Sequence, residues 1–294
     1  LETMEMRISR LHPQFGVDVH GVDLRQATET VLYPQIREVF EKHSLVLFRG
    51  QHLSDAEHLA FARLFGPIED RSNIRMDGAP KVSYNVSNED GDGGVLSEDD
   101  LHLLNLKSNM LWHTDSTFLP CPALANVLQA RVVPAEGGAT EYVSTRAGFR
   151  ALGPAMRERL RTLTFRHRYS HSRARIDPKL AEQDKFTMWR DQEWQAVWRN
   201  PVTGEDALYV ASHAFAVPGM GEDEGAELIE DLIAAVTQPD AVYAHSWQPG
   251  DVIVWDERAT LHRGTPWPYE QPRTLVSCCV SARAIDGLDT VRPG

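Results

Sequence analysis

The sequence has few cysteines, no long apolar run and a shortage of positive charge. Its three cysteines, Cys121, Cys278 and Cys279, are too few for a disulfide framework, and none stands in a Cys-x-x-Cys metal knuckle. This usage is typical of a reducing compartment, so we expect a cytoplasmic protein. No apolar run approaches the roughly 20 residues that span a bilayer, so we expect no membrane partner.

Acidic side chains outnumber basic ones. The 294 residues include 42 Asp and Glu against 30 Lys and Arg, which gives a net charge of −12 at pH 7. An acidic chain repels nucleic acid and anionic membrane surfaces, so we expect no nucleic-acid partner. Hydrophobic residues still make up 42% of the chain, enough for a sizeable core. Because no linker divides the sequence, residues 4–294 are predicted to form a single domain.

The spacing of apolar residues predicts helices and short strands. The Ser54-Asp55-Ala56-Glu57 capping box marks the start of one helix, and Gly153-Pro154 interrupts another. Helices are predicted over residues 30–43, 54–65, 144–163 and 222–236. Strands are predicted over residues 6–11, 45–48, 111–118, 126–133, 140–143, 208–211, 242–247, 251–256 and 273–283. This order favours a mainly β fold, with a double-sheet core and flanking helices.

Residues 70–108 differ in composition from the rest of the chain. Asn, Asp, Gly and Ser accumulate there, with Asp90-Gly91-Asp92-Gly93-Gly94 at the centre. A loop of this length is usually either a functional lid or a mobile linker. Because it leads directly into the strand predicted at 111–118, we interpret it as an active-site lid. Plain surface disorder is the alternative.

The predicted strand at 111–118 carries the first candidate metal ligands. Side chains alternate between the two faces of a strand, so His113 and Asp115 should point the same way. One imidazole and one carboxylate are two thirds of the facial triad of non-haem iron(II) oxygenases. We predict that His262 completes it. Taken alone, a His-x-Asp pair is more often a strand histidine paired with a carboxylate for local charge balance than a metal site.

Motifs along most of the chain then strengthen this interpretation. Residues 252–264 read VIVWDERATLHRG, and Arg273 follows His262 by eleven positions. This segment and Arg273 occur together with the motifs GVDL, FARLFGP, WHTDSTF, GGATE and PGD. In the motifs and their order, the sequence resembles the iron(II)/2-oxoglutarate-dependent dioxygenases. The resemblance is to the taurine dioxygenase and 2,4-dichlorophenoxyacetate dioxygenase family. It implies a double-stranded β-helix (jelly-roll) core.

The resemblance also implies a reaction and its cofactors. Fe(II) would be bound by His113, Asp115 and His262, with 2-oxoglutarate and O2 as cosubstrates. Oxidative decarboxylation of 2-oxoglutarate to succinate and CO2 would be coupled to hydroxylation of a substrate C–H bond. Where that carbon carries a heteroatom leaving group, the product collapses to a carbonyl. Alkylsulfonates, sulfate esters, aryloxyalkanoates and sulfo-sugars are the substrate types that this suggests.

Three residues match the family's cosubstrate site. Arg273 matches the arginine that binds the distal carboxylate of 2-oxoglutarate. A carboxylate is best bound by a planar, bidentate donor, which an arginine side chain provides. Thr140 matches the threonine that hydrogen-bonds the same group. Trp255 matches an aromatic wall beside the cosubstrate.

The substrate side departs from the family pattern. In many relatives an arginine four residues after the cosubstrate arginine grips the substrate's sulfonate or carboxylate, but here that position is Ser277. Either an anionic substrate is bound by the basic stretch 165–176 or by the lid, or the substrate is neutral and polar. The substrate-side candidates are Arg168 and Arg173 of the basic stretch, with Asn109, Tyr84, Asn85 and His213.

Two rival functions remain open from the sequence. A zinc hydrolase could use the same two histidines and aspartate to activate water, although Arg273 and Thr140 would then have no role. A non-catalytic binding protein on this scaffold would be expected to have a broken triad, and the triad is intact. Dimers and tetramers are usual in the family that the chain resembles, so we expect a homodimer or homotetramer.

Overall fold

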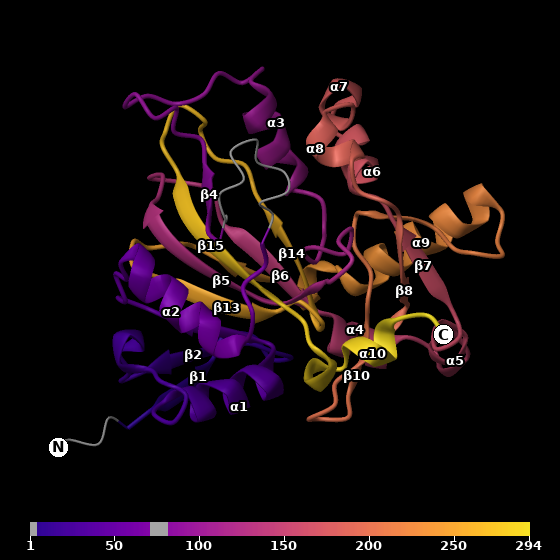
Figure 1. The fold of residues 1–294 in the computed structure, drawn as a ribbon, viewed down its shortest axis with the longest axis horizontal. Helices are drawn as coiled ribbons and strands as arrows, with labels where there is room; N and C mark the ends of the chain where they lie inside the picture. The colour runs from indigo at the N-terminus through magenta and orange to yellow at the C-terminus, as the bar shows by residue number, and fades with distance from the viewer. Residues whose placement is uncertain (1–4, 71–81) are drawn as a thin grey trace.

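The computed structural model describes residues 5–70 and 82–294, in which a large sheet forms the centre of the fold (Figure 1). The sheet has the strand order β1-β2-β3-β13-β5-β15-β4, and every neighbouring pair is antiparallel except β2 and β3. Segments from both ends of the chain therefore alternate within it. Its strands are β1 (Arg7–Arg10), β2 (Val17–His20), β3 (Leu45–Phe48), β4 (Tyr84–Ser87), β5 (Ala123–Val132), β13 (Val252–Asp256) and β15 (Thr274–Ser281).

A second, three-stranded antiparallel sheet packs against one face of the large sheet. It consists of β12 (Tyr243–His245), β6 (Thr140–Ser144) and β14 (Thr260–Gly264), with β6 in the middle. Tyr142 of β6 is fully buried in one cluster with Ile253 and Trp255 of β13. Because side chains alternate along a strand, Val252 and Val254 of β13 face the opposite side.

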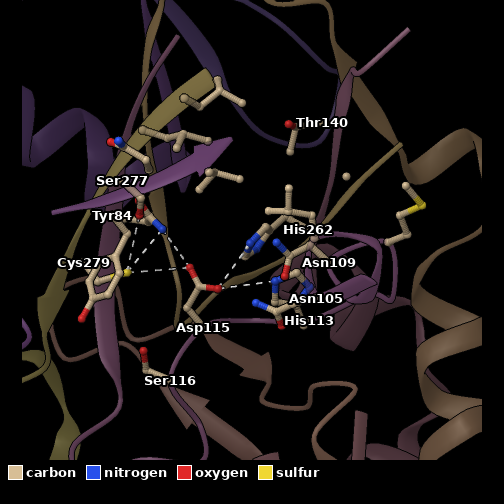
Figure 2. A pocket seen from close by; sticks show the side chains of 18 of the residues that line it. Tyr84, Asn105, Asn109, His113, Asp115, Ser116, Thr140, His262, Ser277 and Cys279 are labelled. Atoms are coloured by element: carbon tan, nitrogen blue, oxygen red, sulfur yellow. Dashed lines mark hydrogen bonds and ion pairs between the residues drawn. The ribbon is translucent and has the colours of Figure 1, made fainter. Parts of the chain in front are cut away.

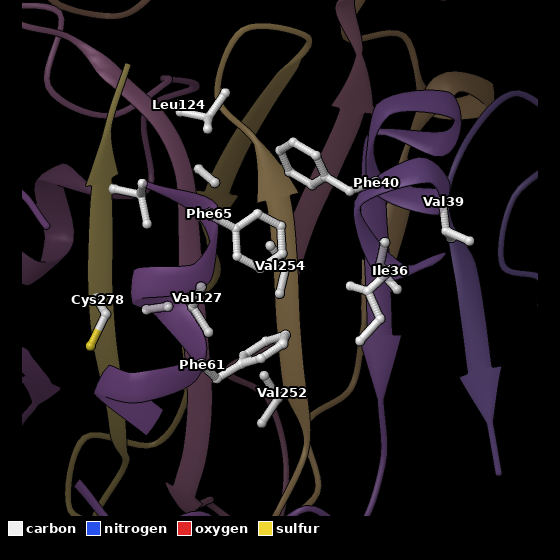
Figure 3. Close-up of a cluster of buried hydrophobic side chains, with 14 of the residues drawn as sticks. Ile36, Val39, Phe40, Phe61, Phe65, Leu124, Val127, Val252, Val254 and Cys278 are labelled. Carbon is white, nitrogen blue, oxygen red and sulfur yellow. The ribbon is translucent and has the colours of Figure 1, made fainter. Parts of the chain in front are cut away.

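Two helices cover that opposite side (Figure 3). The helix α1 (Tyr33–His43) contributes Ile36 and Phe40, and α2 (Asp55–Phe65) contributes Phe61 and Phe65, to one buried cluster with the outer side chains of β13 and β5. The predicted capping box of α2 is present. The core therefore has three layers: helices, the large sheet and the small sheet.

Smaller elements form the remainder of the described chain. In a further buried cluster, α9 (Glu222–Val236) packs against α4 (Thr145–Ala151) and against another three-stranded sheet, of order β11-β7-β8. About 31% of the residues are helical and 27% are in strands, so the prediction of a mainly β fold understates the helices. The other elements are β7 (Thr164–His167), β8 (Gln192–Gln195), β9 (Val197–Arg199), β10 (Asp206–Leu208), β11 (Ala214–Ala216), α3 (Leu101–Ser108), α5 (Pro154–Leu160), α6 (Tyr169–Ala174), α7 (Pro178–Ala181), α8 (Asp184–Thr187) and α10 (Leu288–Val291).

The strand predicted over residues 111–118 is wrong. His113 makes a single antiparallel bridge with His262, and the chain then turns, with Ser116 in the left-handed region at φ +67°. The turn is set by distant partners, because the Thr114 hydroxyl and the Asp115 backbone N–H both donate to the Glu257 carboxylate. Propensity for a strand is overridden here by tertiary hydrogen bonds.

The stretch 70–108 is not one continuous loop. Residues 71–81 lie outside the described part of the chain, but beyond them β4 pairs with β15 and α3 begins after an Asp100 cap. The predicted strand at 208–211 also needs correction, since β10 ends at Leu208. Within residues 5–70 and 82–294, none of the helices has the length and apolar character needed to cross a bilayer.

A buried ionic network fixes the turn between β13 and β14. The Arg258 guanidinium donates to the carboxylates of Asp256 (2.8 Å) and Glu41 (2.7 Å) and to the Asp286 carbonyl oxygen (3.0 Å), and all four residues are buried. Because His262 follows this turn on β14, the network contributes to the position of a candidate ligand.

We expect Arg258→Met to lower the free energy of unfolding by about 3–5 kcal/mol, because it leaves two buried carboxylates without their shared cation. Urea unfolding monitored by circular dichroism measures this. The exposed Arg150–Glu205 pair provides the control, since Arg150→Met should cost less than about 1 kcal/mol. Equal losses in the two variants would contradict a stabilising role for the network.

Candidate metal and cosubstrate site

The two histidines and the aspartate predicted as metal ligands lie together in the structure. One ligand atom from each of His113, Asp115 and His262 lies within 4.8 Å of the others. The Asp115 Oδ1 atom is 3.4 Å from His113 Nε2 and 3.5 Å from His262 Nε2 (Figure 2). The prediction that segments about 150 residues apart meet here is confirmed.

Backbone pairing brings the two histidines together. The His113 N–H donates to the His262 carbonyl oxygen (3.0 Å), and the His262 N–H donates back to the His113 carbonyl oxygen (2.8 Å). The imidazole ring centroids are consequently 4.1 Å apart. Residues directly opposite each other in an antiparallel pair have both side chains on the same face, where both can bind the same metal ion.

The protonation states suit a divalent cation. His113 Nδ1 lies 2.7 Å from the Leu111 carbonyl oxygen, which can only accept, so Nδ1 carries the proton and Nε2 offers its lone pair. Burial, reinforced by the nearby His113, lowers the pKa of His262 to about 3, which leaves this imidazole neutral. Burial alone would raise the pKa of Asp115, but the imidazoles of His262 and His113 hold it well below its usual value.

Glu257 is a neighbour of this site that the sequence did not predict. Its buried carboxylate accepts from the Asp115 backbone N–H (2.9 Å), the Thr114 hydroxyl (2.6 Å) and Trp255 Nε1 (2.8 Å). Burial and the negative charge of Asp115 raise the pKa of Glu257 well above its ordinary value. Trp255 thus makes two contacts at this site: its Nε1 donates to Glu257, and its ring centroid lies 4.7 Å from that of His262.

Asn126 contacts Asp115 and is itself contacted by Ser277. The Asn126 amide nitrogen donates to Asp115 Oδ2 (2.9 Å), and the Ser277 hydroxyl donates to the side-chain oxygen Oδ1 of Asn126 (2.8 Å). The only local signal for Asn126 was a polar residue within the otherwise apolar run Ala123-Leu124-Ala125 and Val127-Leu128. No local pattern pairs it with Asp115.

Arg273 and Thr140 lie near each other at another part of the same cavity. Arg273 Nε and Nη2 donate to the Gly138 carbonyl oxygen, at 3.2 and 3.0 Å. Gly138 has φ +71°, and a side chain there would approach Arg273 Nε to 3.0 Å, so glycine is needed at this contact. Burial lowers the pKa of Arg273 to about 10, which still leaves it cationic at neutral pH.

The Thr140 hydroxyl oxygen accepts from Trp247 Nε1 at 2.8 Å. Its own proton therefore remains available to an acceptor in the cavity, such as a carboxylate. Trp267 flanks the same region, with its ring 5.1 Å from the Arg273 guanidinium carbon. This end of the cavity combines a buried cation with a hydroxyl donor.

A single cavity of about 470 Å³ contains the triad, Arg273 and Thr140. The strands β4, β5 and β15 and the helices α3, α6 and α8 also line the cavity, and these helices gather at one end of the molecule (Figure 1). Five of the predicted substrate-side residues line this cavity, namely Tyr84, Asn85, Asn109, Arg173 and His213.

Arg168 does not line the cavity. It donates to both carboxylate oxygens of Asp191, at 2.8 Å each, and its guanidinium carbon lies 4.2 Å from the Phe215 ring centroid. Arg166 and Arg175 likewise pair with Glu193 and Glu230 at the surface. Of the arginines in the basic stretch, all of which are described, the structure brings only Arg173 to the cavity.

Arg173 is buried among polar and aromatic groups. Its Nε donates to Asn105 Oδ1 (3.2 Å), its Nη1 donates to the Ser172 hydroxyl oxygen (2.9 Å), and its guanidinium carbon is 4.3 Å from the Tyr169 ring centroid. The same Ser172 hydroxyl contacts His213 Nδ1 at 2.9 Å. Burial and the nearby Arg173 lower the pKa of His213 well below its usual value, so it is neutral.

Comparisons with known proteins agree with this geometry. The family described as "Taurine catabolism dioxygenase TauD, TfdA family" matches residues 7–279. The (S)-phenoxypropionate/alpha-ketoglutarate-dioxygenase of Sphingobium herbicidovorans is 33% identical, with 91% of this chain and 92% of that protein aligned. The alpha-ketoglutarate-dependent 2,4-dichlorophenoxyacetate dioxygenase of Cupriavidus pinatubonensis is 34% identical, with 92% and 96% aligned.

A solved structure gives the same picture. The crystal structure of AAD-2 in complex with Mn(II) and N-oxalylglycine superposes with a TM-score of 0.86 at 32% identity, covering 95% of this chain and 98% of that one. The resemblance inferred from the motifs is thus confirmed. With most of its length matched by both sequence and structure, the chain belongs to the TauD, TfdA family and is a 2-oxoglutarate-dependent dioxygenase.

Proposed function

We propose that this dioxygenase uses Fe(II), 2-oxoglutarate and O2 to hydroxylate a C–H bond beside a heteroatom in a small anionic molecule, on a jelly-roll core. The observation that carries the proposal is the convergence of two imidazoles and one carboxylate in a cavity that also holds Arg273 and Thr140. Bound iron would supply the activation of O2 that accompanies decarboxylation of 2-oxoglutarate to succinate and CO2.

His113, Asp115 and His262 would hold the iron. Neutral imidazole and carboxylate are ligands that Fe(II) accepts, and a set of three leaves positions for the cosubstrate and O2. The His113–Leu111 hydrogen bond supports this role, because it fixes the tautomer that offers Nε2 to the metal. The same three residues would suit zinc, but a zinc hydrolase gives no role to Arg273 and Thr140 and is not favoured by the dioxygenase relatives.

Arg273 and Thr140 would bind the distal carboxylate of 2-oxoglutarate. A charged donor and a hydroxyl donor, both buried, form strong hydrogen bonds to a carboxylate because water does not compete with them. Trp255 would form a wall beside the cosubstrate, since its ring lies against His262 and lines the cavity. None of these side chains has to react; they bind, orient and exclude water.

The substrate would occupy the part of the cavity bounded by Arg173, His213, Tyr84, Asn85 and Asn109. Arg173 supports an anionic substrate, because it places a buried cation on the wall of this region. Relatives whose names specify phenoxypropionate, 2,4-dichlorophenoxyacetate and sulfate esters agree with this chemistry. Alkylsulfonates, sulfate esters, aryloxyalkanoates and sulfo-sugars are the substrate types that we propose to screen.

Within the stretch 70–108, the described residues 82–108 would act as a lid. The described part supports this role, since β4 and α3 contribute Tyr84, Asn85, His102, Asn105 and Leu106 to the cavity wall. We further propose a cytoplasmic homodimer or homotetramer. Cysteine usage supports the compartment, and the family resemblance supports the assembly.

Anaerobic addition of Fe(II) and 2-oxoglutarate should produce a visible charge-transfer band, and air should then yield succinate. Asp115→Ala should abolish the band and lower succinate formation by at least about 99%, because the carboxylate ligand is lost. Absorption spectroscopy and succinate quantification check this. A colourless wild-type mixture that forms no succinate would contradict the proposed function.

Arg273→Gln should raise the apparent KM for 2-oxoglutarate about 10- to 100-fold, because a charge-assisted hydrogen bond worth roughly 1.5–3 kcal/mol is removed. Steady-state succinate formation at varied 2-oxoglutarate measures the change. Arg263→Gln is the matched control, since this arginine pairs with Glu141 and does not line the cavity. Similar KM values in the two variants would argue against Arg273 as the carboxylate donor.

Arg173→Ala should raise the apparent KM for whichever anionic substrate the screen identifies, by about tenfold or more, because the cavity loses a buried cation. Arg168→Ala should leave that KM within about twofold, since Arg168 lies outside the cavity. Substrate-dependent succinate formation compares the two. If both variants bind the anion as the wild type does, the anion is bound elsewhere.

A further inference from the structure

The arrangement around Asp115 points to a residue that controls how this ligand faces a metal. Strands β5 and β15 are adjacent and antiparallel, and their register places Asn126 directly opposite Cys279. Ser277 lies two residues before Cys279 and therefore on the same face of the sheet. All three side chains are buried and line the cavity. Asn126 and Cys279 contact Asp115, and Ser277 contacts Asn126; Figure 2 shows Ser277, Cys279 and Asp115 in one group.

Hydrogen bonds fix the orientation of the Asn126 amide. The Ser277 hydroxyl donates to the amide oxygen at 2.8 Å. The amide nitrogen donates to Asp115 Oδ2 at 2.9 Å and to Cys279 Sγ at 3.4 Å. Because a carboxylate can only accept, the amide nitrogen must face Asp115, and the amide oxygen is left to accept from the Ser277 hydroxyl. A turned amide would place its oxygen against Asp115 Oδ2 and lose that contact.

The two oxygens of Asp115 consequently differ in their surroundings. Oδ1 faces the Nε2 atoms of His113 and His262, at 3.4 and 3.5 Å, whereas Oδ2 is engaged by Asn126. The backbone of Asp115 is restrained as well, because its N–H donates to Glu257. The carboxylate therefore presents one oxygen, and not two, to the point where the histidine nitrogens converge.

A single-oxygen ligand matters for this enzyme class. A carboxylate that binds through both oxygens takes an additional coordination position, and the facial triad is useful because it leaves positions open. Mutation of a residue that holds a metal ligand by a hydrogen bond typically lowers metal affinity about 10- to 100-fold. An amide that holds Oδ2 away from the metal position would keep the site open for the cosubstrate.

We propose that Asn126, oriented by Ser277, is a positioning residue that keeps Asp115 a single-oxygen metal ligand. The proposal rests on the proposed function, since it assigns the triad to a metal. The proposal also gives Ser277 a role, because its hydroxyl donates to the Asn126 amide oxygen and so orients the amide beside the metal site. An anionic group of the substrate must then be recognised by other residues, in agreement with the placement of Arg173.

The test is an anaerobic Co(II) titration of metal-free protein, followed through the visible d–d absorption. We expect Asn126→Leu, which keeps the side-chain size, to raise the Kd for Co(II) about 10- to 100-fold and to change the shape of the bands. Ser277→Ala should change both in the same direction but less, because the amide remains and loses only its orienting partner.

A double-mutant comparison separates this relay from a merely structural effect. If Ser277 acts through Asn126, the double variant should bind Co(II) no more weakly than Asn126→Leu alone. Gln129→Leu is the matched control, since it removes another buried amide from β5 on the opposite face, where Gln129 donates to the Leu53 carbonyl oxygen. Its Kd and spectrum should equal those of the wild type.

Wild-type affinity and bands in Asn126→Leu would overturn the proposal, as would additive losses in the double variant. If Asn126→Leu does not fold, Ser277→Ala carries the test, and a wild-type spectrum in that variant overturns it. Failure of the proposed function would appear differently. In that case wild-type protein would form no succinate from 2-oxoglutarate, while the Co(II) titrations would still report whether Asn126 positions Asp115.

Discussion

The approach of one carboxylate to two imidazoles, inside a buried cavity, is the constraint on which the rest of this structure depends. Burial disfavours an isolated carboxylate, so Asp115 requires hydrogen-bond donors on every side that the imidazoles do not occupy. Asn126 of β5 provides such a donor to Oδ2, whereas the two histidines, which a backbone bridge joins, face Oδ1. The Arg258 network in turn fixes the turn that precedes His262. The candidate site is thus the meeting point of segments that no short piece of the chain could assemble.

Local sequence patterns were informative where local forces decide the structure. The helix predicted over residues 222–236 has the same bounds as α9, because its apolar spacing agrees with its packing. The prediction failed at 111–118, where strand-forming residues adopt a turn that is fixed by Glu257. For the same reason the sequence could not distinguish Arg168 from Arg173: both are arginines in one basic stretch, and only the fold directs one of them into the cavity. The triad itself was predictable because its spacing and flanking motifs occur together.

Family membership and cavity composition answer different questions. Membership identifies the reaction type, since the relatives share a 2-oxoglutarate requirement in their names. The substrate depends on the residues that differ, and here the cavity has buried arginines contributed by β15's preceding loop and by α6. A chain with a net charge of −12 thus has a cavity whose cations favour anions. The net negative charge of the chain repels an anion at long range, whereas the arginines of the cavity attract it at short range. An anion therefore gains most of its binding energy only once it is inside the cavity.

The alternation of early and late strands in the large sheet has a consequence for how the protein is made. The strand β5 has β13 and β15 as its two neighbours, and both are encoded near the end of the chain. During synthesis the middle of the sheet therefore cannot form until β13 and β15 have left the ribosome. Such long-range pairing slows folding and exposes unpaired strand edges in the meantime. His262 lies in the same late segment, so a nascent chain can bring the three candidate ligands together only after β14 has been synthesised.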